Sequence, residues 1–285
     1  MKKILIIDST GMAGHVISKY LLSLNLYNVV DVECFTAQNK LKVSLDLMDQ
    51  NAVKELIEDQ NPDIVINCAR VLIDESEDSP AKAIYVNSYL PHLLEQFCQN
   101  KQTRIIHLST DCVFSGLKGD YDENEDTDGK NYYAKTKALG EINNNKDLTI
   151  RTSFIGPNIG DKYEELFHWF MMQEGDIKGY SKVYWTGVTT LELAKCIKEV
   201  IEIDISGLYH LVPENKISKY ELLVLIGKVM KRNKVFIGKD DKIVLDKSLT
   251  DNRKAIFVKN YPEMFDELKT WMIDNKELYT KYFSY

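Results

Sequence analysis

The first fourteen residues have the pattern of a strand, a tight turn and the start of a helix. Residues 3–8 are mostly apolar and partly β-branched, and the turn after them, Thr10-Gly11-Met12-Ala13-Gly14, contains two glycines. Glycines in such a turn let backbone N–H groups approach a phosphate and let the next helix pack closely on the strand. The pattern therefore predicts the first strand–helix unit of a parallel sheet with a dinucleotide-binding turn.

Apolar strands and helical segments continue to alternate through the first half of the chain. This alternation predicts an α/β fold with a Rossmann-like, doubly wound parallel sheet, in which ligands bind at the carboxyl ends of the strands. The glycine turn, Asn67 and Thr110 all fall at such ends. The expected strands are 3–8, 28–35, 63–67, 104–108 and 148–152, and the expected helices between them include 50–59 and 80–99.

The cofactor turn departs from the usual dinucleotide fingerprint. Asp8 stands where a third glycine is usual, and its negative charge would be unfavourable beside a bound pyrophosphate. The end of the second strand, residues 33–37, has neither a clear acid for a ribose hydroxyl nor an arginine for a 2′-phosphate. Lys40 and Lys42 could contact a phosphate, although solvated lysines are the commoner case. The choice between NAD(H) and NADP(H) therefore stays open.

Composition and charge exclude several classes of protein. Hydrophobic residues make up 44% and charged residues 28% of 285 residues, and the net charge of −7 argues against nucleic acid or an anionic membrane as partner. The apolar run Ile4–Ile7 ends at Asp8, too short for a signal peptide or a membrane span. The five cysteines form no Cys-x-x-Cys pair, which favours free thiols in a reducing cytoplasm.

Tyr133 and Lys137 are the candidates for proton transfer. Four residues apart on an expected helix, they share one face. An ammonium near a phenol favours the phenolate and lowers the pKa of the phenol, so this tyrosine could pass a proton near neutral pH. The spacing alone is weak, because it also arises by chance on amphipathic helices.

Two further features have a structural and a functional interpretation. The acidic loop 119–129 could hold a metal ion, but it lacks the calcium-loop spacing, and a solvated loop over the active site is favoured. His168 lies in the apolar segment 164–172, a predicted helical pocket wall, where a packed histidine is favoured over a catalytic one. No metal site is predicted.

The chain shows no repeat and no low-complexity linker. We expect residues 1–155 to form the NAD(P)-binding domain, with 183–205 returning to it. Residues 156–182 and 206–285 would form a smaller substrate-binding lobe with helices near 219–230 and 262–275.

With these residues placed, the chain resembles the extended short-chain dehydrogenase/reductase family. Within that family it is most similar to the dTDP-4-dehydrorhamnose reductase group of nucleotide-sugar 4-ketoreductases. The motifs that carry the resemblance extend over nearly the whole chain. They are Thr10–Gly14, Ser44–Leu47, Asp63–Asn67, Val86-Asn87, Ser109–Asp111 with Val113-Phe114, Tyr133 with Lys137, Gly140-Glu141, Arg151–Ser153 and Trp185–Leu191.

The resemblance implies a role for each matching residue. Thr110 would hydrogen-bond the substrate carbonyl, Tyr133 would donate the proton, and Lys137 would hold the cofactor ribose. Asn87 would support the active-site strand and helix. The remaining cofactor contacts would come from Thr10, Gly11, Met12, Ala13, Gly14, Asp46, Leu47, Cys68 and Ala69.

The departures from the group's pattern fall on the substrate side. Cys112 replaces a usual tyrosine, Phe154 replaces a common tryptophan, and Arg70 lies where small residues are usual. With Thr110, these form the expected substrate-binding set, although Arg70 could equally be a surface residue. A related 4-keto-6-deoxy nucleotide sugar, including an N-acetylated and UDP-linked one, is as compatible as dTDP-4-dehydrorhamnose.

The resemblance implies a cytoplasmic NADP(H)- or NAD(H)-dependent reductase for surface polysaccharide synthesis. A homodimer is compatible with it. Two alternatives stay open. Asp111 directly after Thr110 is compatible with an epimerase or dehydratase, and Asp8 in the phosphate turn is compatible with a non-catalytic dinucleotide-binding regulator.

Overall fold

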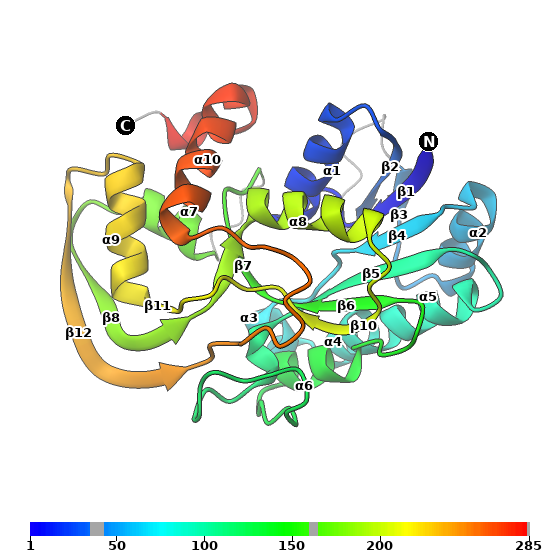
Figure 1. Ribbon diagram of the computed structural model, residues 1–285, viewed down its shortest axis with the longest axis horizontal. Helices are drawn as coiled ribbons and strands as arrows, with labels where there is room; N and C mark the ends of the chain where they lie inside the picture. Colours follow the sequence, from blue (N-terminus) through cyan, green and yellow to red (C-terminus); the bar gives the residue numbers. More distant parts are fainter. Residues whose placement is uncertain (35–42, 160–164, 284–285) are drawn as a thin grey trace.

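The computed structural model describes residues 1–34, 43–159 and 165–283, so the expectations for 35–37, Lys40, Lys42, Gly160 and Glu164 lie outside the described residues. A parallel sheet with helices on both faces adjoins a smaller lobe with its own curved sheet (Figure 1). Within the described part of the chain, no helix is long and apolar enough to cross a membrane.

The main sheet has seven strands in the order β10-β6-β5-β4-β1-β2-β3, and every pairing in it is parallel. The order reverses at β1, as in a Rossmann-like fold, which confirms the predicted fold class. The strands are β1 (Lys2–Ile7), β2 (Tyr27–Cys34), β3 (Val43–Leu45), β4 (Ile64–Asn67), β5 (Arg104–Ser109), β6 (Leu148–Arg151) and β10 (Gly207–His210).

Alternation along β1 divides the core between the two faces of the sheet. Ile4 and Ile6 belong to the cluster that includes residues of α1 (Gly14–Ser23) and α8 (Thr190–Glu202). Leu5 and Ile7 belong to the cluster on the opposite face. Because successive side chains of a strand point to opposite faces, a strand covered on both sides is apolar throughout. The opposite face is covered by α2 (Gln50–Gln60) and α5 (Leu90–Cys98).

The helix expected over 80–99 is built from three connected pieces. α4 (Pro80–Ala83) passes into a π-helical turn, η1 (Ile84–Tyr89), and then into α5. A π-helical turn widens a helix locally and often marks a functional site. Here it presents the buried Asn87 toward the active-site helix α6 (Tyr132–Leu139).

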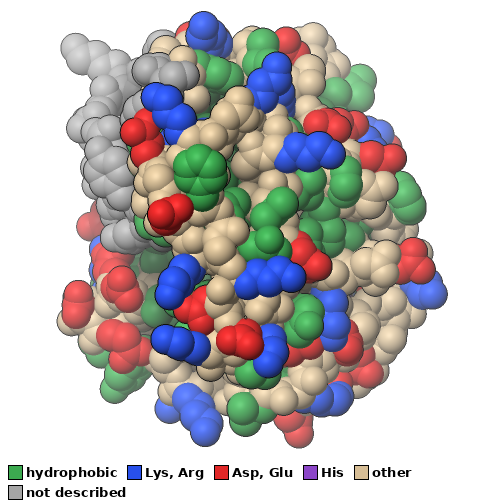
Figure 2. All heavy atoms as spheres, turned by 90° about the vertical axis from the view of Figure 1, so that its left-hand side faces the viewer, with side chains coloured by type: hydrophobic (Ala, Val, Ile, Leu, Met, Phe, Trp, Pro, Cys, Tyr) green, Lys and Arg blue, Asp and Glu red, His purple; other side chains and the backbone are tan. Residues whose placement is uncertain are grey.

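The smaller lobe is built around a three-stranded sheet. β8 (Gly175–Trp185) pairs with β11 (Ile217–Ser218) on one side and with β12 (Val235–Asp246) on the other. On the face of the molecule that carries this lobe, Figure 2 shows basic and acidic side chains intermixed with apolar ones. The remaining elements are α3 (Ile73–Asp78), η2 (Asp111–Val113), β7 (Ser153–Ile155), α7 (Leu166–Met171), β9 (Gly187–Thr189), α9 (Lys219–Val229), α10 (Tyr261–Asp274), η3 (Lys276–Leu278) and η4 (Thr280–Tyr282).

The expected division of the chain is wrong at two places. The segment 183–187 does not return to the main sheet, because β8 lies in the lobe sheet and β9 pairs with β7. The return is made by α8, which packs on α1, and by β10, which forms the edge of the main sheet beside β6. We expected Gly207–His210 in the smaller lobe. This expectation is wrong because the sequence of one short apolar strand does not indicate which sheet the strand joins.

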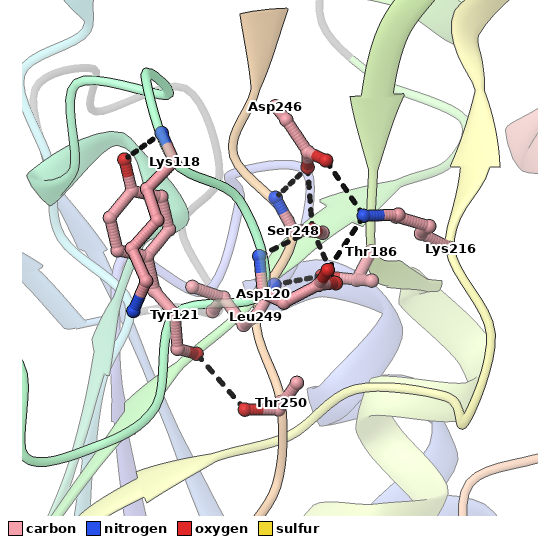
Figure 3. A network of polar contacts seen from close by, with 9 residues as sticks. All are labelled: Lys118, Asp120, Tyr121, Thr186, Lys216, Asp246, Ser248, Leu249 and Thr250. Carbon is pink, nitrogen blue, oxygen red and sulfur yellow. Dashed lines mark hydrogen bonds and ion pairs between the residues drawn. The ribbon is translucent and has the colours of Figure 1, made fainter.

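Ion pairs and hydrogen bonds connect the acidic loop, residues 119–129, to the lobe (Figure 3). The expectation of a solvated loop did not include these contacts. The Lys216 ammonium lies 2.8 Å from the Asp120 carboxylate and 2.7 Å from that of Asp246. The backbone N–H of Asp120 donates to the Ser248 hydroxyl at 2.8 Å, and Tyr121 forms an isolated bridge with Leu249. The loop thus fastens the segment after β12 to the region beside the active-site strand end.

Candidate active site

A pocket of about 210 Å³ lies where the carboxyl ends of β4 and β5 meet the lobe. It brings together eight of the residues selected from the sequence. These are Met12, Cys68, Arg70, Thr110, Cys112, Tyr133, Lys137 and Phe154. The lobe supplies further walls through Glu165, Leu166, Phe167, Trp185 and Lys219, which confirms the segment before and within α7 as a pocket wall.

Thr110 follows directly on β5 and is held by two hydrogen bonds. Its hydroxyl donates to Asp111 Oδ1 at 3.1 Å and accepts from the Cys112 backbone N–H at 3.1 Å, which caps η2. A capping threonine has a fixed side-chain direction. The hydroxyl therefore stands at the pocket wall in one orientation.

Tyr133 lies in the first turn of α6, 7% exposed and facing the pocket. Burial raises the pKa of its phenol above the ordinary value, and the adjacent Cys112 raises it further. The charge of Arg70 and the nearby Thr110 hydroxyl lower it. The phenol is therefore a neutral O–H group that can donate a proton or hydrogen bond.

Lys137 shares the pocket and the helix face with Tyr133, but its contacts differ from those expected. Its Nζ lies 2.7 Å from the Leu108 carbonyl oxygen and 3.2 Å from His107 Nε2, and the side chain is 1% exposed. Burial lowers the pKa of Lys137 to about 7. The expected lowering of the Tyr133 pKa by Lys137 is therefore wrong for this arrangement, because the lysine turns toward β5.

Asn87 connects the loop after β4 to the active-site helix. Its Oδ1 accepts from the Val71 N–H at 2.8 Å, and its Nδ2 donates to the Val71 carbonyl and to Thr136 Oγ1 at 3.0 and 3.2 Å. Since Thr136 lies on the helix that carries Tyr133 and Lys137, this buried amide fixes the helix against β4. The contacts agree with the expected supporting role.

Asp8 adopts the backbone conformation that a glycine usually supplies in such a turn. Its φ is +62°, a left-handed value that aspartate tolerates better than most residues. A β-carbon at Gly14 would lie 2.0 Å from the Asp8 carbonyl oxygen, so only glycine lets α1 begin this close to the turn. Thr10 and Gly11 complete the turn and are partly exposed, while Ala13 is buried at the start of α1.

The other expected cofactor residues divide between the surface and the core. Asp46 is exposed, and its carboxylate accepts from the Met48 N–H at 2.9 Å. Leu47 is fully buried in the core cluster below β2, so its side chain is not available to a ligand. Cys68 and Ala69 are buried directly after β4, where Cys68 lines the pocket.

Arg70 is a pocket residue, and its interpretation as a surface arginine is wrong. Its guanidinium lies 2.6 Å from Glu165 Oε1 and 5.0 Å from the centre of the Phe154 ring. Both charged side chains are largely buried, at 12% and 14% exposure. The pair joins the loop after β4 to the lobe and places Phe154 against the pocket.

A second charged group, Lys219, reaches the pocket from the lobe and was not predicted from the sequence. Lys219 begins α9, and its Nζ lies 4.9 Å from the centre of the Trp185 ring. Burial lowers the pKa of Lys219, while the charge of Asp111 raises it. The start of this helix was predicted, and Ser218 and Glu221 cap it with a capping box, but the sequence does not give the direction of its first side chain.

Asp111 and Cys112 form the corner between Thr110 and Lys219. Burial raises the pKa of the Asp111 carboxyl, which Lys247 and Lys219 oppose. Burial also raises the pKa of the Cys112 thiol to about 11, so the thiol is neutral at physiological pH. Cys112 thus presents a small, uncharged surface to the pocket.

A buried ion pair between Arg151 and Glu141 supports the carboxyl end of β5. The Arg151 guanidinium donates to both carboxylate oxygens of Glu141 at 2.7 and 2.6 Å, and the Ser109 hydroxyl donates to the same carboxylate at 2.7 Å. This bidentate geometry fixes β5, β6 and the end of α6 to one another. Ser109, which directly precedes Thr110, is therefore held in place.

His168 is packed, as expected. Its Nδ1 lies 2.9 Å from the Tyr282 hydroxyl, and its side chain is 1% exposed. Among the described residues, no group of three or more His, Cys, Asp or Glu side chains is arranged to hold a metal ion.

The RmlD substrate binding domain model matches residues 1–275. The chain belongs to this family. Membership confirms the resemblance indicated by the sequence motifs.

Individual RmlD-family relatives show how far the similarity extends. A dTDP-4-dehydrorhamnose reductase of Mycolicibacterium smegmatis is 37% identical over 99 residues, 34% of this chain and 30% of the relative. The Escherichia coli dTDP-4-dehydrorhamnose reductase is 25% identical over 235 residues, 78% of this chain and 76% of the relative. The chain thus spans about a third of the length of the first curated relatives that it matches.

A solved structure supports the same fold. The dTDP-4-dehydrorhamnose reductase of Bacillus anthracis, in complex with NADP, has a TM-score of 0.80 at 20% identity. The alignment covers 95% of this chain and 99% of the other. At this identity the likeness describes the fold of the RmlD family alone.

Proposed function

We propose that the protein is an NAD(P)H-dependent reductase of the C4 ketone of a nucleotide-activated 6-deoxysugar, similar to dTDP-4-dehydrorhamnose. The observation that carries the proposal is the convergence of Thr110, Tyr133 and Lys137 on one pocket at the carboxyl ends of the strands. A binding module has no need of all three groups there.

The glycine turn and its surroundings fit a dinucleotide. The turn opens the ten-residue helix α1, whose N-terminal N–H groups favour an anion. The buried Ser9 hydroxyl has no hydrogen-bond partner among the described residues. Met12 and Cys68 connect the turn to the pocket that holds Tyr133. The residues that would hold the cofactor are those of the turn, with Cys68, Ala69 and Lys137.

When bound, a reduced nicotinamide supplies the hydride. The ketone oxygen gains negative charge in the reaction, and the Tyr133 phenol is a donor available to it. The Thr110 hydroxyl becomes a second donor when its O–H group turns from Asp111 toward this oxygen. Tyr133 then transfers its phenolic proton to this oxygen, giving an alcohol and a phenolate. Arg70 and Lys219, which both line the pocket, provide cations for an anionic nucleotide sugar.

The test is a panel of 4-keto nucleotide sugars with NADH and NADPH, followed by absorbance at the reduced cofactor's band. The proposal expects stoichiometric oxidation of free cofactor with at least one dTDP- or UDP-linked 4-keto-6-deoxysugar. Turnover of a nucleotide sugar without net oxidation would replace it with an epimerase or dehydratase. The position of Asp111 in the pocket, directly after Thr110, favours that second candidate, because burial raises the pKa of this carboxyl and a raised pKa suits a general acid.

The proposal extends to the setting of the enzyme. It places the protein in the cytoplasm, in the synthesis of a surface polysaccharide, with a nucleotide sugar as partner. Sedimentation of the purified protein would determine whether it is a homodimer.

A further inference from the structure

His107 and Asn67 form a buried connection to Lys137 that the proposed mechanism does not use. Asn67 ends β4, His107 lies beside it on β5, and the two are register partners in the parallel sheet. Both are fully buried, and Lys137 is 1% exposed. Water therefore does not compete for their polar atoms.

The orientation of the Asn67 amide follows from its backbone neighbour. The Ala69 backbone N–H lies 3.1 Å from Oδ1 of Asn67, and an N–H group can only donate. The atom that it contacts is therefore the amide oxygen. The amide nitrogen then faces His107 Nδ1 at 3.2 Å and donates to it.

The tautomer of His107 follows in turn. A ring nitrogen that accepts a hydrogen bond carries no proton, so Nδ1 is bare and the single proton of the neutral ring is on Nε2. Burial lowers the pKa of His107 well below its ordinary value, so the ring is neutral. The Nε2–H group then points at Lys137 Nζ, 3.2 Å away.

An ammonium has three donors and no acceptor, so it cannot receive this N–H group. A neutral amine can, because it has a lone pair, and it still has two N–H bonds. One of these donates to the Leu108 carbonyl at 2.7 Å. We propose that His107 is a positioning residue that holds Lys137 as a neutral amine in this arrangement, with its own orientation fixed by Asn67.

The other charged and titratable groups around the lysine do not reverse this assignment. The charge of Arg70 lowers the pKa of Lys137, whereas Glu141 and Cys68 raise it, and burial outweighs them, giving a pKa of about 7. The Glu141 carboxylate is already shared between Arg151 and Ser109. The groups that act on Lys137 are Cys68, Arg70 and Glu141, and Tyr133 shares its pocket, whereas His92 on α5 acts on His107 from a distance.

The consequence for the proposed reductase is a proton-state requirement. Lys137 can raise the acidity of Tyr133 by its charge only when it is an ammonium. In the arrangement held by His107, Lys137 exerts no such charge, and it gains one only by protonation or by turning away from the ring. This consequence rests on the proposed activity, while the assignment of the protonation state does not.

The experiment is NMR of the protein without cofactor, with labelled histidine and lysine. The ring ¹⁵N shifts of His107 are expected to show a protonated Nε2 and a bare Nδ1. The ¹³Cε resonance of Lys137, assigned by its loss in Lys137→Met, is expected to titrate several pH units below the ordinary lysine value of about 10.4. A protonated Nδ1, or titration of Lys137 together with surface lysines, would overturn the proposal.

The variant His107→Gln separates the effect of the ring from that of burial. The glutamine amide oxygen can accept from an ammonium, so the Lys137 midpoint should rise by about one pH unit or more. The control His92→Gln, on the exposed face of α5, should leave it within about 0.3 unit, since His92 acts only through a distant charge. An unchanged midpoint in His107→Gln would show that burial alone sets the lysine, which also overturns the proposal.

The wild-type spectra decide the tautomer even if His107→Gln does not fold. Where reductase activity is found, the alkaline limb of the pH profile of kcat/KM should move to higher pH in His107→Gln. If no ketosugar is reduced, the NMR results still stand, so failure of the proposed function and failure of this inference are distinguishable.

Discussion

The Asp8 carboxylate lies against Gly11: a β-carbon at Gly11 would come within 2.5 Å of Asp8 Oδ2. The turn that would hold a pyrophosphate thus carries an anion folded back over its own glycine. The charge of this carboxylate also acts on Arg70, whose pKa it helps to raise. Asp8 therefore influences both the cofactor side and the substrate side of the pocket.

Asp8→Asn should strengthen dinucleotide binding. Asparagine tolerates the same left-handed backbone and has nearly the same shape, so the change removes the charge and replaces one acceptor oxygen with an NH₂ donor. A charge at a helix N-terminus is worth ~0.3–1 kcal/mol, so the Kd should fall by about two- to fivefold. Fluorescence titration with NADH and NADPH, at low and high salt, measures this. Weaker binding by Asp8→Asn would instead show that the carboxylate accepts a hydrogen bond from the ligand.

Tyr133→Phe should abolish turnover and retain cofactor binding. The ring still fills its buried place, but no phenolic proton is available, so kcat/KM should fall by roughly 10²–10⁴-fold. The neighbouring Tyr132, which is 45% exposed, offers the matched control Tyr132→Phe, which should stay close to wild type. Full activity in Tyr133→Phe would rule out the proposed proton donor.

Lys219→Met should raise KM for the nucleotide sugar while changing kcat little. A hydrogen bond to a charged group is worth ~1.5–3 kcal/mol, so KM should rise by about tenfold or more, and Lys219→Arg should recover part of this. Because burial lowers the pKa of Lys219, its charge is lost at a lower pH than that of an exposed lysine. The wild-type KM should therefore rise as pH increases through that lowered pKa, and the Met variant should lack this rise. A steady-state pH series with both variants checks it.

Glu141→Gln should destabilise the fold. It leaves the Arg151 guanidinium, 5% exposed, without its charged partner, a change that costs ~3–5 kcal/mol in buried pairs. Denaturant unfolding measures this loss. The exposed pair Lys54–Glu58 provides the comparison, and Glu58→Gln should cost under about 1 kcal/mol. Equal effects of the two changes would mean that the Arg151 pair carries no special share of the stability.

Features encoded locally were predictable from the sequence. The turn at Gly11 and Gly14 and the helix that carries Tyr133 and Lys137 depend on short-range patterns, and the structure has them where expected. The position of Thr110 was predicted correctly, because a residue that directly follows a buried parallel strand lies at the carboxyl-end edge of the sheet.

Features that depend on long-range packing were not predictable. The direction of Lys219 depends on how α9 packs on β8, and nothing near Ser218 encodes it. The contact of Lys137 with His107 joins a helix to a strand, and the spacing from Tyr133 gives only the helix face. The Glu165 partner of Arg70 lies 95 positions away, so a surface position could not be excluded from the sequence.

The edge strand β10 sets an order of events during synthesis. The main sheet is complete only when Gly207–His210 pairs with β6, after all of β8 and α8 has been made. A nascent chain that has released only the first 155 residues exposes the unpaired edge of β6 and the uncovered apolar face that α8 later shields. Unpaired edges and exposed apolar surface favour association between chains. Association between nascent chains is therefore expected to be favoured until α8 and β10 have been made.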